Sequence, residues 1–91
     1  MIYLIVYDIT KDKIRNEVSK RIKNWGGERI QYSAFKIELD ERKLESLLNE
    51  LKNILGCERG RIVAIPVCKK DLENIITLYN NYKLKTEDII L

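Results

Sequence analysis

Apolar residues along this 91-residue chain occur either in short continuous runs or at helical spacing. The runs predict strands and the helical spacing predicts helices. Residues 2–7 are apolar or aromatic at every position, which is typical of a strand covered on both faces. Segments 29–39 and 61–67 are rich in β-branched and aromatic residues and predict further strands. The first of these breaks near Tyr32-Ser33, which indicates two short strands, and Pro66 places the second at a sheet edge or strand end.

Apolar residues at helical spacing predict two helices between these strands. The first is expected to start after an N-cap at Thr10 and to end at Gly26-Gly27, with a stripe of Ile14, Val18, Ile22 and Trp25. The second is expected between Asp40 and Gly56, and its stripe is the clearest in the chain: Leu44, Leu47, Leu48, Leu51, Ile54 and Leu55. Residues 72–80 fit a helix or a strand, and the apolar tail 87–91 suggests a docked strand.

The predicted order of elements is β-α-β-β-α-β, the order of the ferredoxin-like α+β fold. In this fold two helices cover one face of an antiparallel sheet and the other face stays open. Because the first strand is apolar on both faces, we expect a second copy of the chain to cover the open face. We expect one domain over 1–91, with a core over 1–68 and an additional segment over 69–91.

The charge distribution and the absence of histidine limit the kinds of partner and of catalytic site that the chain can have. Segment 10–36 holds eight basic and three acidic residues, which favours a polyanionic partner such as nucleic acid. The chain has no histidine, which excludes a Ser/His/Asp triad and a His-ligated zinc site.

No window is long and apolar enough to span a membrane, so we expect a soluble, cytoplasmic protein. Cys57 and Cys68 are expected to be free, buried thiols.

Asp8 is the first candidate for chemistry, because an uninterrupted apolar run ends on its carboxylate. It could cap the following loop, or it could bind magnesium. One carboxylate per chain is a poor magnesium site, since the ion usually has more than one anionic ligand. A two-fold dimer would bring two copies of Asp8 together and make the metal interpretation credible.

Other side chains near the first helix are candidates for nucleic-acid binding. Lys11, Lys13, Arg15 and Asn16 lie at its start, and Arg15 could hold a phosphate through its guanidinium fork or be a solvated surface residue. Tyr7 and Phe35 could pack in the core or an interface, or they could stack on bases.

Several motifs resemble the CRISPR-associated Cas2 family. They are YDIT at the end of the first strand, Arg15-Asn16 and Val18 on the basic helix, a glycine after Trp25, the segment RIQYSAFKIEL, and the strand that closes on IPVC. The run from Arg29 to Phe35 is the most specific, because the family carries Arg-x-Gln-Tyr-Ser-x-Phe there. The likeness extends from residue 1 to about residue 68.

The resemblance implies a ferredoxin-like homodimer with facing sheets and an extra C-terminal strand that reaches across the dimer, so we choose a strand for 75–79 and for the tail. It implies a site of Tyr7, Asp8, Arg15, Arg29 and Phe35, with Asp8 as the ligand of magnesium or manganese and Arg29 as a further nucleic-acid contact. The implied activity is metal-dependent cleavage of single-stranded RNA or double-stranded DNA.

Three functions remain open on the sequence. The first is an endonuclease of CRISPR spacer acquisition, which also binds the DNA to be integrated. The second is a non-catalytic adaptor that binds DNA and bridges the CRISPR integrase, Cas1. The third is a generic ferredoxin-like module for RNA recognition or metabolite sensing, which the lack of an RGF-type signature makes the weakest.

Overall fold

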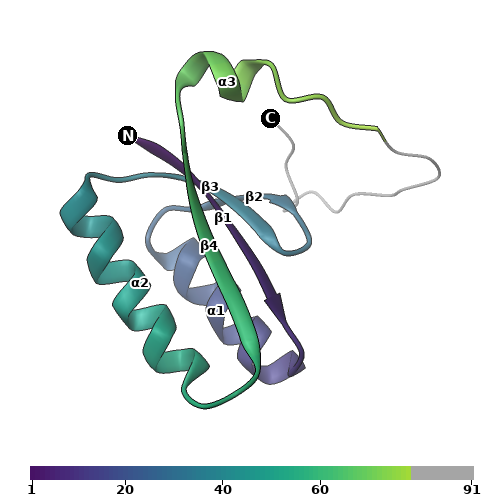
Figure 1. Cartoon of the computed structure of the whole chain (residues 1–91), viewed down its shortest axis with the longest axis vertical. Coiled ribbons are helices and arrows are strands. Elements are labelled where there is room, and N and C mark those ends of the chain that lie inside the picture. Colours follow the sequence, from purple (N-terminus) through teal and green to yellow (C-terminus); the bar gives the residue numbers. More distant parts are fainter. Residues whose placement is uncertain (79–91) are drawn as a thin grey trace.

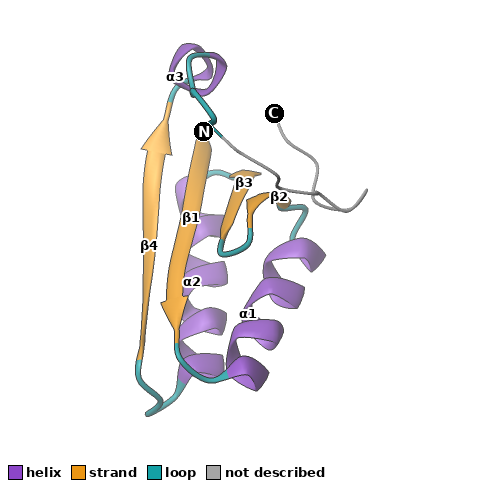
Figure 2. Ribbon diagram, turned by 90° about the vertical axis from the view of Figure 1, so that its right-hand side faces the viewer, coloured by secondary structure: helices purple, strands orange, loops and turns teal. Residues whose placement is uncertain are grey.

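The computed structural model describes residues 1–78, which form a four-stranded antiparallel sheet covered on one face by two helices. The strands are β1 (Ile2–Ile9), β2 (Glu28–Gln31), β3 (Ala34–Glu38) and β4 (Gly60–Val67), and their order in the sheet is β2-β3-β1-β4. The helices α1 (Asp12–Asn24) and α2 (Glu41–Leu55) lie side by side against the same face (Figures 1 and 2). The predicted ferredoxin-like α+β fold is confirmed.

The core lies between this sheet face and the helices. Strand alternation directs Tyr3, Ile5, Tyr7 and Ile9 of β1 toward the helices, where each is at most 5% exposed. The helices contribute the buried parts of the two predicted stripes, which are Val18 and Ile22 from α1 and Leu47 and Leu51 from α2.

The helix ends follow local signals with one exception. The Asp40 side chain accepts a hydrogen bond from the Lys43 N–H at 2.8 Å and caps α2, as predicted. Gly26 and Gly56 follow the helices with positive φ angles of 99° and 57°. The predicted N-cap at Thr10 is wrong, because the N-cap of α1 is Lys11 and its side chain makes no capping hydrogen bond.

The two thiols are exposed, so the prediction that they are buried is wrong. Cys57 lies in the turn after α2. Cys68 is the N-cap of the short helix α3 (Lys69–Glu73), where its sulfur accepts a hydrogen bond from the Asp71 N–H at 3.4 Å. This capping position is outside the core, which explains why the sulfur is accessible to solvent.

The second face of the sheet is covered by neither helix, and we call it the open face. Its centre is apolar and is formed by side chains that alternate with the core residues of β1 and their cross-strand neighbours on β4: Ile2, Leu4, Val6, Val63, Ile65 and Val67. Val6 and Ile65 are 38% and 41% exposed. The order of the strands also places β4, with Pro66, at the edge of the sheet, as predicted.

After β4 the chain differs from the prediction. Residues 69–73 form α3, and residues 74–78 are neither helix nor strand, so the described part of the strand expected over 75–79 is not formed. A strand needs a neighbour for its backbone hydrogen bonds, and residues 74–78 have none within the described chain. Residue 79 and the tail lie outside the described residues. Within residues 1–78, no helix has the length and apolar character needed to cross a membrane.

Candidate functional site

Asp8 lies within β1, one residue before its end, and its side chain is on the open face. The strand continues through Asp8 to Ile9, so this carboxylate is part of the sheet and not of the following loop. Its cross-strand neighbour on β4 is Arg61, whose side chain is therefore on the same face. Both residues are exposed and line a shallow hollow of about 340 Å³ together with Val6, Val63 and Ile65.

The surroundings of Asp8 decide what it can bind. Within residues 1–78 there is no group of three or more His, Cys, Asp or Glu side chains that could hold a metal ion. One chain therefore offers a single carboxylate at this position, which does not fit a magnesium site by itself. A second chain that met the first along the open face could supply another Asp8, because the carboxylate is exposed there.

Tyr7 and Phe35 lie on the other side of the sheet, in the core. Phe35 is fully buried and Tyr7 is 3% exposed, and their rings stack with centroids 6.3 Å apart. Burial raises the pKa of the Tyr7 hydroxyl, and the nearby Arg29 partly offsets this rise. Neither ring has a free face for a base in this chain, which agrees with the core interpretation of the two aromatic residues.

Arg15 and Arg29 come together around the turn between β2 and β3. The guanidinium of Arg29 lies 4.9 Å from the Phe35 ring centroid and donates to the Tyr32 carbonyl at 2.6 Å. The guanidinium of Arg15 lies 5.5 Å from the Tyr32 ring centroid, donates to the Ile9 carbonyl at 3.0 Å and is paired with Asp12. Both arginines therefore hold turns of the chain in place.

The five site residues implied by the resemblance do not all come together within one chain. Tyr7, Phe35, Arg15 and Arg29 form one cluster on the helix-covered side, whereas Asp8 is on the open face. The reason is strand geometry: Tyr7 and Asp8 are adjacent in sequence, so their side chains point to opposite faces.

The candidate nucleic-acid contacts at the start of α1 are divided as well. Lys11 forms an ion pair with Glu58 at 2.8 Å, which links the loop after β1 to the loop before β4. Lys13 and Asn16 are exposed on α1. Of the positions predicted from the sequence, Asp8, Lys11, Lys13 and Asn16 are exposed, whereas Arg15 and Arg29 are partly buried.

Sequence reasoning missed Arg61 and Tyr32. Arg61 opens a strand that was interpreted only as apolar, and its place opposite Asp8 follows from the antiparallel register of β1 and β4. Tyr32 lies at the predicted bend and within the Arg29–Phe35 motif, and its ring lies beside both Arg15 and Arg29, a contact that the sequence does not indicate. Arg61 could have been found by assuming that the first and last strands of the fold pair antiparallel, because this sets the start of β4 against the end of β1.

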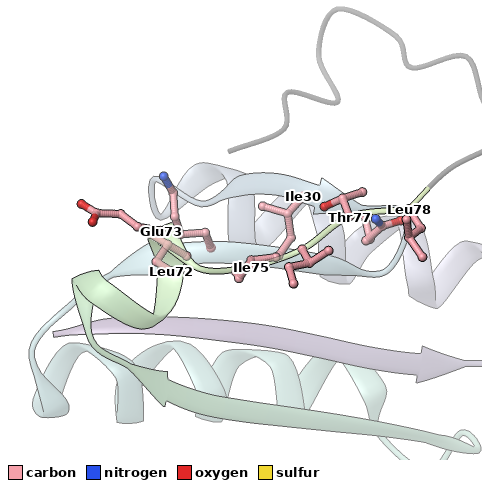
Figure 3. A pocket seen from close by; sticks show the side chains of 9 residues that line it. Ile30, Leu72, Glu73, Ile75, Thr77 and Leu78 are labelled. Atoms are coloured by element: carbon pink, nitrogen blue, oxygen red, sulfur yellow. The ribbon is translucent and has the colours of Figure 1, made fainter.

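A second hollow of about 520 Å³ lies where residues 72–78 pass over the open face beside β2 (Figure 3). It is lined by Ile30, Lys36, Leu72 and Ile75 among others, and Lys36 lies opposite Leu4 of the open face. The same segment leaves Ile76 and Leu78 at 87% and 93% exposed. The segment thus adds exposed apolar side chains to the open face and does not complete its cover.

The family described as CRISPR associated protein Cas2 matches residues 1–75. The CRISPR-associated endoribonuclease Cas2 of Desulforudis audaxviator is 38% identical over 69 residues, which are 76% of this chain and 65% of that protein. The CRISPR-associated endoribonuclease Cas2 1 of Archaeoglobus fulgidus is 34% identical over 80 residues, which are 88% of this chain and 85% of that protein.

Two solved structures share the fold. A hypothetical protein from Thermus thermophilus superposes with a TM-score of 0.68 and 34% identity, over 74% of this chain and 80% of that one. Streptococcus pyogenes Cas2 superposes with a TM-score of 0.77 and 21% identity, over 87% of this chain and 100% of that one. The second likeness supports the fold alone.

Proposed function

Because the chain belongs to the CRISPR-associated Cas2 family, we propose that it is a homodimeric, metal-dependent endonuclease of spacer acquisition that also binds the DNA to be integrated. The relatives from Desulforudis audaxviator and Archaeoglobus fulgidus are both named as endoribonucleases, which supports phosphodiester cleavage with single-stranded RNA as the first substrate to test. The observation that carries the proposal is the exposed carboxylate of Asp8 on an uncovered sheet face.

A homodimer is supported by the open face. Val6 and Ile65 are exposed at its apolar centre, and Ile76 and Leu78 add to the apolar surface beside it. Covering a contiguous apolar surface of this kind with a partner is favourable. A second copy of the chain can cover it with the same apolar surface, as in a two-fold dimer. Asp8 and Arg61 lie at one end of β1 and β4, beyond this apolar centre, so covering the centre can leave the charged end at the rim.

Two copies of Asp8 are the ligands that this chain offers to a divalent cation. A bound magnesium or manganese ion would polarise a phosphodiester oxygen and lower the pKa of a bound water. Asp8 itself supplies negative charge at an exposed position that a nucleic-acid strand can reach. Arg15 and Arg29 are not assigned to this step, because they lie on the opposite side of the sheet.

Asp8→Asn tests the proposal, because asparagine keeps the shape of the side chain and removes its charge. Cleavage of labelled single-stranded RNA and of double-stranded DNA in magnesium should fall to the level seen with EDTA. Circular dichroism and sedimentation should be unchanged, since Asp8 is exposed. Cleavage at the wild-type rate by the variant would contradict the nuclease proposal.

One observation favours the adaptor alternative: within residues 1–78, no group of three or more possible metal ligands accompanies the Asp8 carboxylate. A DNA-holding dimer that bridges the CRISPR integrase needs no metal. In that case the Asp8→Asn dimer would still bind duplex DNA and capture the integrase, and neither it nor the wild type would cleave RNA or DNA. Spacer integration would then be unaffected by the substitution, which separates the two functions.

A further inference from the structure

We propose that Arg61 is a phosphate-binding residue of the Asp8 site and that it holds a nucleic-acid backbone there even without a metal ion. The proposal rests on the function proposed above, since it takes the Asp8 end of the open face as the place where nucleic acid binds. It adds the Arg61 guanidinium to the site, although Arg61 is 53 positions away from Asp8 in the sequence.

The register of the sheet places Arg61 beside Asp8. The two residues are Cα partners on β1 and β4, and partners in an antiparallel pair have Cβ atoms about 4.5–5.5 Å apart on the same face. Both line the hollow of about 340 Å³, and the other side chains that line it on this face are those of Val6, Val63 and Ile65. These apolar side chains offer no hydrogen-bond acceptor to the guanidinium.

Two other cations of this region, Lys11 and Arg15, are already engaged. Lys11 is paired with Glu58, and Arg15 is held by Asp12 and by the Ile9 carbonyl. Within residues 1–78, by contrast, Arg61 takes part in no ion pair or side-chain hydrogen bond, including with its neighbour Asp8. Its donors are therefore available to a ligand.

The charge of Asp8 creates the need for such a cation. An exposed carboxylate repels a phosphate, and the rest of the open face near it is apolar. A guanidinium on the adjacent strand offsets this repulsion and presents two parallel N–H donors, which match the oxygens of a phosphate. The pair therefore combines a carboxylate for a cation with a guanidinium for a phosphate at one end of the sheet.

Arg61→Gln tests the proposal, with Arg42→Gln as the matched control. Arg42 is exposed in the first turn of α2, on the helix side of the sheet, so its substitution removes the same charge at a distant place. Binding is measured in EDTA by fluorescence anisotropy with labelled single-stranded RNA and, separately, with duplex DNA, at several salt concentrations. Because no metal and no cleavage are involved, the result is independent of nuclease activity.

Arg61→Gln should weaken binding about tenfold, as expected for the loss of one charged hydrogen-bonding contact. The slope of log affinity against log salt should fall by about 0.7 for RNA or about 0.9 for duplex DNA, whichever binds. Arg42→Gln should change neither quantity, and Asp8→Asn should strengthen binding by removing a repulsive charge. Wild-type affinity in Arg61→Gln, or an equal loss in Arg42→Gln, would overturn the proposal. Failure of the nuclease proposal would instead appear as unchanged cleavage in Asp8→Asn.

Discussion

Substitution of Phe35 distinguishes a core residue from a site residue. Phe35 is fully buried, and the Arg29 guanidinium lies 4.9 Å from its ring centroid. Phe35→Leu removes about three buried carbon atoms, which is worth about 2 kcal/mol at about 0.8 kcal/mol for each carbon group. Loss of the cation–π contact adds about 0.5–1 kcal/mol. The expected destabilisation is therefore about 2.5–3 kcal/mol, a large part of the roughly 5–15 kcal/mol available to a domain.

The assay compares Phe35→Leu with Leu51→Ala. Leu51 is also fully buried but belongs to α2, and its truncation should cost about 2–5 kcal/mol. Urea and thermal unfolding should show similar losses for the two variants, with midpoints lower by about 10–20 °C for Phe35→Leu. At a temperature where both variants are fully folded, each should bind nucleic acid and cleave it as the wild type does.

Two results would refute this reasoning. The first is a loss of binding or cleavage in fully folded Phe35→Leu while Leu51→Ala retains both, because this would give Phe35 a direct role at the site. The second is a destabilisation below about 0.5 kcal/mol, the level expected for surface positions, because Phe35 would then not be part of the core.

Two further predictions concern association and pH. Ile65→Lys places a charge on the apolar centre of the open face and should raise the dimer dissociation constant at least about tenfold in sedimentation; an unchanged dimer would mean that another surface associates. Glu50 accepts hydrogen bonds from Arg21 and Trp25, and the Arg21 bond chiefly lowers its pKa from 4.5. Its stabilising contribution is therefore present above about pH 4.5 and is lost as pH falls through the lowered pKa. Glu50→Gln should flatten the acid side of the stability profile measured by urea unfolding, and an identical profile would contradict this.

Features that depend on neighbours in sequence could be predicted. The Asp40 cap and the stripe with Leu47 and Leu51 rest on contacts within one or two helical turns, so the residue types are sufficient to indicate them. The apolar character of both faces of β1 was also readable, because strand alternation has a fixed period of two. These local signals, taken in order, gave the ferredoxin-like fold.

Features that depend on strand pairing could not be predicted with the same reasoning. Whether Tyr7 or Asp8 faces the helices is decided by which side of β1 the helices pack against, and either choice buries apolar side chains. The cluster of Arg15 and Arg29 around Tyr32 likewise depends on how the turn between β2 and β3 meets α1.

Local sequence patterns were sufficient to predict the four strands of the sheet, helices α1 and α2, the fold and a carboxylate at the end of an apolar strand, but not α3. The three-dimensional packing was needed to show that Asp8 lies on the opposite face of the sheet from Tyr7 and Phe35, and that Arg61 lies opposite Asp8 on β4. The register of hydrogen bonds pairs residues that are distant in the chain, and the residue types around each position do not reveal which residues will pair. The expected metal ligand therefore has, as its nearest charged neighbour across the sheet, a residue that no motif singled out.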